Sequence, residues 1–127
     1  MKGVVESGTG ARLRYKYNFT NPIAGKTGTT QNNSDGWFMG LTPGLVTGVW
    51  VGCEDRSVHF RATNLGQGAN MALPIWAIYM RKAMEDKRLN LPMGDFDKPK
   101  KPLSVEINCE KYDAEHKGNT VNFDKLF

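Results

Sequence analysis

The stretch IAGKTGTTQNNSDGWFMGLTPGLVTGVWVG, residues 23–52, decides the fold. Two turn signals divide it, the polar cluster QNNSDG at 31–36 and the tripeptide TPG at 42–44. The segments between them contain Val, Thr and Trp, which are typical of strands. Connections this short join antiparallel strands rather than parallel ones. The pattern therefore predicts three antiparallel strands, near residues 22–30, 35–41 and 45–52.

A helix is predicted near residues 70–86, after an irregular, charged connection. Apolar side chains recur there at three- and four-residue spacing, which is the period of one helix face. We expect Asn70 to cap this helix and Pro74 to lie in its first turn, where amides lack partners inside the helix. Trp76 and Met80 should be buried against the sheet. The predicted fold class is α+β: a three-stranded antiparallel sheet with a C-terminal helix packed on one face.

The 127 residues suffice for one domain at most. The expected division is a folded part at 1–88, a linker rich in proline and charge at 89–102, and a tail of unknown role at 103–127. Within the tail, LSVEI at 103–107 alternates like a strand. Residues 1–10 read as the end of a helix, too short to begin a domain, and no signal peptide is visible. We therefore expect Met1 to be an internal position of a longer protein.

Composition excludes several classes of function. The formal charge of +4 comes from dispersed residues and indicates a solvated surface, so no nucleic-acid partner is expected. Cys53 and Cys109 form no C-x-x-C pair, and His59 and His116 fit no metal motif. The two cysteines are free thiols or, in an oxidising compartment, one disulfide. We expect neither a metal nor a cofactor, and no apolar run approaches the roughly 20 residues that span a bilayer.

The motif that carries chemistry is GKTGTT at residues 25–30. A phosphate-binding P-loop ends in Gly-Lys-Ser/Thr, but it begins with a glycine where this chain has Thr20. A P-loop also opens a helix that receives the phosphate. Here Gly28 and the turn at 31–36 follow, so the sequence disfavours the P-loop.

A Lys-Thr-Gly strand of a serine acyl-transferase suits the motif better. A strand at a sheet edge can bind a peptide through main-chain hydrogen bonds. Lys26 and the Thr27 hydroxyl would hold a substrate carboxylate. Gly28 would leave room for the substrate backbone, and the amide after it, that of Thr29, can point at a developing oxyanion. Because strand neighbours face opposite sides, Lys26 and Thr27 reach one ligand only from a sheet edge.

The residues around the motif resemble the transpeptidase domain of class A penicillin-binding proteins, from about Lys2 to Ala83. The segments that carry the resemblance are GVV at 3–5, GTGA at 8–11, IAGKTGTT at 23–30, DGWFMGLTP at 35–43, VWVG at 49–52 with Asp55, GA at 68–69 and PIW at 74–76. The resemblance implies part of the penicillin-binding and β-lactamase-like fold. It also implies a parent protein anchored in the bacterial inner membrane, with this domain on the periplasmic or extracytoplasmic side.

In that family a serine in S-x-x-K attacks the D-alanyl-D-alanine end of a peptidoglycan stem peptide, and β-lactams acylate the same serine. The resemblance implies that Lys26, Thr27, Gly28 and Thr29 bind substrate. This chain departs from the pattern, because the residues three positions after its four serines are Gly10, Trp37, Phe60 and Ile107. None makes S-x-x-K, and no S-x-N is present. We therefore expect no catalytic nucleophile and no activity of this chain alone. The alternative is a non-catalytic β module that binds a peptide or carboxylate.

The resemblance also bears on self-association. In the resembled fold, the strand at 45–52 pairs with a strand from an early part of the domain that this chain does not contain. The edge at 45–52 is apolar and has no charge or proline to discourage pairing. We expect the chain to self-associate, edge to edge or by exchange of an element. A fold-back of 103–107 onto the open edge is the less favoured outcome.

Overall fold

The computed structural model describes residues 1–101, 103–104 and 107–116. The chain divides into two units, Met1–Asp97 and Lys98–Phe127. The helices of the first unit are α1 (Lys2–Glu6), α2 (Arg12–Tyr15), α3 (Thr63–Gly66) and α4 (Gly68–Glu85), and its strands are β1 (Ala24–Thr29), β2 (Asp35–Thr42) and β3 (Leu45–Gly52). Two short 3-10 turns, Gln31–Asn33 and Lys87–Leu89, complete it. The second unit contains α5 (Cys109–His116).

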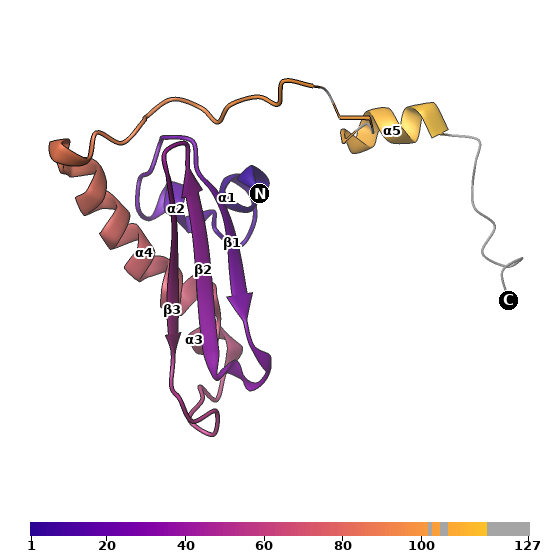
Figure 1. The fold of residues 1–127 in the computed structure, drawn as a ribbon. Helices are drawn as coiled ribbons and strands as arrows, with labels where there is room; N and C mark the ends of the chain where they lie inside the picture. The colour runs from indigo at the N-terminus through magenta and orange to yellow at the C-terminus, as the bar shows by residue number, and fades with distance from the viewer. Residues whose placement is uncertain (102, 105–106, 117–127) are drawn as a thin grey trace, which may run out of the picture. The chain divides into compact units, whose positions relative to one another are not determined.

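The three strands form one antiparallel sheet in the order β1-β2-β3 (Figure 1), which confirms the predicted meander. The register places Gly25 opposite Gly40 and Gly40 opposite Thr47. Because side chains alternate along each strand, these three positions face one side of the sheet, together with Phe38 and Val49. We call this the inner face, and the opposite side the outer face.

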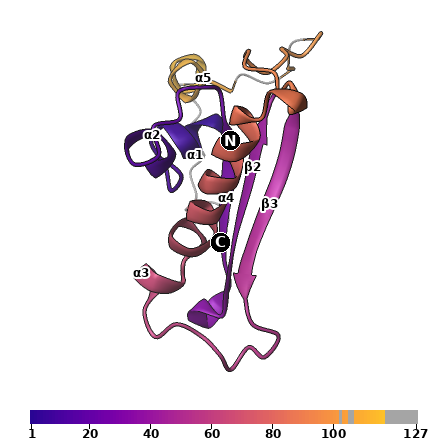
Figure 2. The ribbon, with the colours of Figure 1, turned by 90° about the vertical axis from the view of Figure 1, so that its left-hand side faces the viewer.

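Helix α4 covers the inner face, and α1 and α2 lie on the same side of the sheet (Figure 2). Trp76 and Met80 are both 0% exposed, as predicted. The Trp76 ring meets Phe38 edge-on at 5.2 Å, and its Nε1 donates to the Thr47 hydroxyl at 2.6 Å. The indole N–H therefore has a hydrogen-bond partner although the ring is buried. The buried cluster around it consists of Val5, Leu13, Phe19, Ile23, Phe38, Ala72, Leu73, Trp76, Ala77 and Met80.

The predicted start of the long helix was wrong. Helix α4 begins at Gly68, with Gln67 rather than Asn70 as its N-cap, and Pro74 therefore lies inside the helix and not in its first turn. The cause is tertiary. Thr29 on β1 accepts the Gly68 amide through its hydroxyl at 3.1 Å, so a strand side chain satisfies an amide that the helix cannot.

The C-terminal part also differs from the prediction. Leu103, Ser104 and Ile107 belong to no strand, and residues 105–106 of the expected strand lie outside the described residues. Helix α5, which periodicity did not indicate, occupies Cys109–His116. The Asn108 side-chain oxygen accepts the amide of Glu110 at 3.0 Å, which is the role of a helix N-cap.

Candidate functional site

The Lys-Thr-Gly residues lie on β1, one of the two edge strands of the sheet. The Gly25 amide points away from β2 and donates to the Met1 carbonyl at 3.2 Å. In an antiparallel pair, the amides and carbonyls of alternate residues face the same way. The main-chain groups of Thr27 and Thr29 therefore also point away from β2, toward the open side of β1. This is the arrangement that an extended peptide requires for strand addition.

Lys26 and Thr27 both reach this open side, although their side chains leave opposite faces of the strand. The exposed Lys26 ammonium donates to the outward-facing carbonyl of Thr27 at 2.7 Å. The Thr27 hydroxyl lies on the inner face and is 2.8 Å from the Thr9 hydroxyl. The geometry thus meets the condition that alternation imposes: a cation and a hydroxyl flank one edge position.

Gly28 and Thr29 have different surroundings. A side chain at Gly28 would point to the outer face, where its Cβ would be 3.2 Å from the Trp37 Cβ. The Thr29 hydroxyl is engaged by the Gly68 amide. Thr29 therefore holds the start of α4 with its side chain, while its own amide faces the open edge.

Asp35 fixes the far end of the β1–β2 connection. Hydrogen bonds from Thr30 and from Trp50 hold the pKa of the Asp35 carboxyl below its usual value. The Trp50 Nε1 donates to Asp35 Oδ2 at 3.2 Å, and the Asp35 amide donates to the Thr30 hydroxyl at 3.1 Å. The carboxylate is thus ionised at neutral pH and ties β3 to the turn that follows the Lys-Thr-Gly strand.

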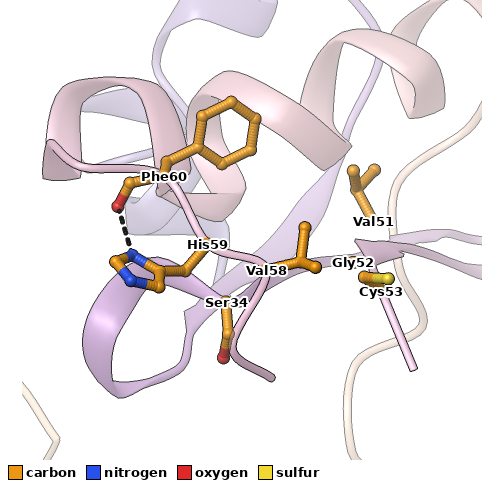
Figure 3. A pocket seen from close by; sticks show the side chains of 7 residues that line it. All are labelled: Ser34, Val51, Gly52, Cys53, Val58, His59 and Phe60. Carbon is orange, nitrogen blue, oxygen red and sulfur yellow. Dashed lines mark hydrogen bonds between the residues drawn. The ribbon is translucent and has the colours of Figure 1, made fainter. Parts of the chain in front are cut away.

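Two pockets differ in whether they border this edge. One, of about 310 Å³, is formed by the end of β3, the connection after it and Ser34 (Figure 3). Its walls are mainly apolar, from Val51, Val58 and Phe60. The His59 Nδ1 is hydrogen-bonded to the Phe60 carbonyl at 3.2 Å. The lining includes none of the four predicted site residues.

The second pocket, of about 210 Å³, is polar and borders the Lys-Thr-Gly edge through Thr9. Arg12 and Gln67 also line it. The Arg12 guanidinium donates to the Ala69 carbonyl at 2.9 Å, which ties the α1–α2 region to the start of α4. Sequence reasoning assigned Thr9 no role. A threonine between two glycines is the only local signal, and the partner lies 18 positions away.

Within the described part of the chain, no three His, Cys, Asp or Glu side chains gather as a metal site. No helix among those residues has both the length and the hydropathy to cross a membrane. Cys53 and Cys109 are free and exposed.

The fold and the site define a sheet whose edge strand can bind an extended peptide. Known proteins of similar sequence and structure indicate the family. No protein-family model matches the chain. It is similar to penicillin-binding protein 1A of Aquifex aeolicus, 37% identical over 111 residues, covering 85% of this chain and 14% of that protein. It is similar to the protein of the same name from Pseudomonas aeruginosa, 38% identical over 109 residues, covering 85% and 12%.

A crystal structure of penicillin-binding protein 1A from Haemophilus influenzae also resembles the chain. The TM-score is 0.53 at 32% identity, covering 77% of this chain and 12% of that one. The chain belongs to the class A penicillin-binding protein family. It spans 14% of the Aquifex aeolicus relative and 12% of the Pseudomonas aeruginosa relative, so it corresponds to a small segment of each.

Proposed function

We propose that this chain supplies the substrate-binding edge of a peptidoglycan D,D-transpeptidase and that the serine nucleophile belongs to another segment of the protein. The observation that carries the proposal is the convergence of the Lys26 ammonium, the Thr27 hydroxyl and the outward amides of Thr27 and Thr29 on one open strand edge. The main chain would bind the stem peptide as an added strand. Lys26 and Thr27 would hold its terminal carboxylate.

The reaction assigns a further role to the amide of Thr29. A serine hydroxyl attacks the carbonyl between the two D-alanines; the serine ester bond forms, the peptide C–N bond breaks, and the departing D-alanine amine takes the proton. An amine of a neighbouring peptidoglycan strand then attacks the ester: the amide bond of the cross-link forms, the ester C–O bond breaks, and the serine oxygen takes the proton of the amine. The Thr29 amide would donate to the oxyanion that develops on the attacked carbonyl. The domain would act on the periplasmic or extracytoplasmic side of the bacterial inner membrane, where that substrate is found.

The chain alone should not be labelled by a fluorescent penicillin, because none of its four serines is followed by lysine at the third position. Denaturing electrophoresis and intact mass measure the adduct, with a full-length class A protein as the positive control. A stoichiometric acyl adduct on any residue of this chain would contradict the proposal that the nucleophile belongs to another segment of the protein.

In the full-length protein, Lys26→Ala should slow acylation by benzylpenicillin roughly 10- to 100-fold, the loss of one charge-assisted hydrogen bond. Lys87→Ala is the matched control, since Lys87 is an exposed lysine in the turn after α4. The second-order acylation rate constant is the measured quantity. Equal rates for the two variants would show that Lys26 does not bind the carboxylate at this strand edge and would favour the non-catalytic β module.

A further inference from the structure

We infer that Thr9 is a positioning residue for the substrate carboxylate and acts through the hydroxyl of Thr27. The inference rests on the proposed function, because it concerns the same edge and the same ligand class. Its starting observation is the 2.8 Å contact between the two hydroxyl oxygens.

The chemistry of two paired hydroxyls gives the contact its meaning. One hydrogen lies between the two oxygens, so the pair retains a single hydrogen to donate elsewhere. A carboxylate only accepts hydrogen bonds. With carboxylate bound at the edge, Thr9 donates to Thr27, and Thr27 donates to the carboxylate. Each hydrogen bond in such a chain polarises the next one, and the first one selects the rotamer of Thr27.

The turn that carries Thr9 is held firmly enough for this role. The Gly10 amide donates to the Val4 carbonyl at 2.9 Å, and the Ala11 amide donates to Gly8 at 3.0 Å. Gly8 packs so closely on α1 that an added Cβ would be 2.9 Å from the Val4 Cα. The turn therefore rests directly on α1.

Helix α1 is in turn attached to the Lys-Thr-Gly strand. The fully buried Val5 anchors the helix in the core, and the Met1 carbonyl accepts the Gly25 amide at 3.2 Å. Thr9 is thus held in place beside β1. It meets the strand at Thr27, two residues after the attachment at Gly25. Its side chain is exposed and makes no contribution to the core.

The test compares Thr9→Val, Thr9→Ser and Lys26→Ala in the full-length protein. For each we measure acylation by benzylpenicillin and by its methyl ester, which lacks the free carboxylate. Thr9→Val should slow acylation by benzylpenicillin roughly three- to ten-fold, the loss of one neutral hydrogen bond. Acylation by the ester should change little, so the preference for the acid falls. Thr9→Ser keeps the hydroxyl, so its rates of acylation by benzylpenicillin and by the ester should equal those of the wild type.

The outcomes separate this inference from the proposed function. If Lys26→Ala is impaired while Thr9→Val keeps the wild-type preference for the acid, the role of Thr9 is overturned and the substrate edge stands. If Thr9→Val slows acid and ester equally, or if Thr9→Ser fails to restore the rate, Thr9 is merely structural and the inference is again overturned. If neither Lys26→Ala nor Thr9→Val changes acylation, both proposals fail together.

Discussion

Gly40→Ala should destabilise the fold by about 3 kcal/mol or more, at the upper end of what overpacking a core costs. A Cβ at position 40 would overlap the Cε2 and Cζ2 atoms of Trp76 and lie 2.6 Å from its Nε1. The indole is fully buried, so it cannot move aside into solvent. Phe38 and Phe19 pack against it, and Thr47 holds its Nε1. A loss of that size is a large part of the stability of a small domain.

Urea denaturation followed by far-ultraviolet circular dichroism measures the effect. Gly3→Ala is the matched control, because no atom beyond its chain neighbours and its own helix backbone lies within 4 Å of a Cβ at Gly3, and alanine suits its helical position. The double variant Gly40→Ala with Trp76→Phe removes the clash and should be less destabilised than the sum of the single changes. If Gly40→Ala is as stable as Gly3→Ala, the indole does not rest on β2.

The second large effect concerns the open edge of β3, through which we propose that the chain self-associates. The Gly25 amide points away from β2, and main-chain groups alternate in direction along an antiparallel ladder. The amides and carbonyls of alternate β3 residues therefore point outward, away from β2: those of Val46, Gly48, Trp50 and Gly52. In the described sheet no strand lies beyond β3. Val46 and Trp50, 61% and 43% exposed, add apolar surface beside that edge. Unpaired edges of this kind pair with another chain.

Light scattering at high protein concentration should give a mass of at least two chains for the wild type. Gly48→Pro should reduce it to one chain, because proline removes an outward amide at the middle of the edge and keeps the ladder to β2. Gly48→Ala is the matched control. It keeps the amide, and its Cβ meets the flexible end of Met39 and lies at an ordinary contact distance of 3.8 Å from the Trp37 Cζ3. We expect this variant to associate like the wild type.

Two results would change this picture. A wild-type chain that remains a monomer at high concentration would show that the β3 edge is covered. A Gly48→Pro variant that still forms dimers would place the association elsewhere, for example in the exchange of an element between two copies. Circular dichroism of each variant establishes that the sheet has formed before its mass is interpreted.

Local signals were enough to predict the meander and the buried helix face. The turns at 31–36 and 42–44 are built from residues that favour turns, and the apolar period of α4 requires no knowledge of its partner. The same holds for the motif at 25–30, whose residue types suggest an edge strand that binds a carboxylate. These features depend on neighbours within a few positions along the chain.

The start of α4 and the pairing of Thr9 with Thr27 were not predictable in this way. Helix α4 begins at Gly68 because the hydroxyl of Thr29 accepts its first amide, and because a glycine there allows the helix to approach the backbone carbonyls of Gly28 and Trp37 closely. Thr9 meets Thr27 because α1 packs on the start of β1. Local sequence signals thus determined that the three strands and α4 form, and which face of α4 is buried. Only the tertiary structure decided where α4 begins and which hydroxyls meet at the substrate edge, because both depend on contacts between residues far apart in the chain.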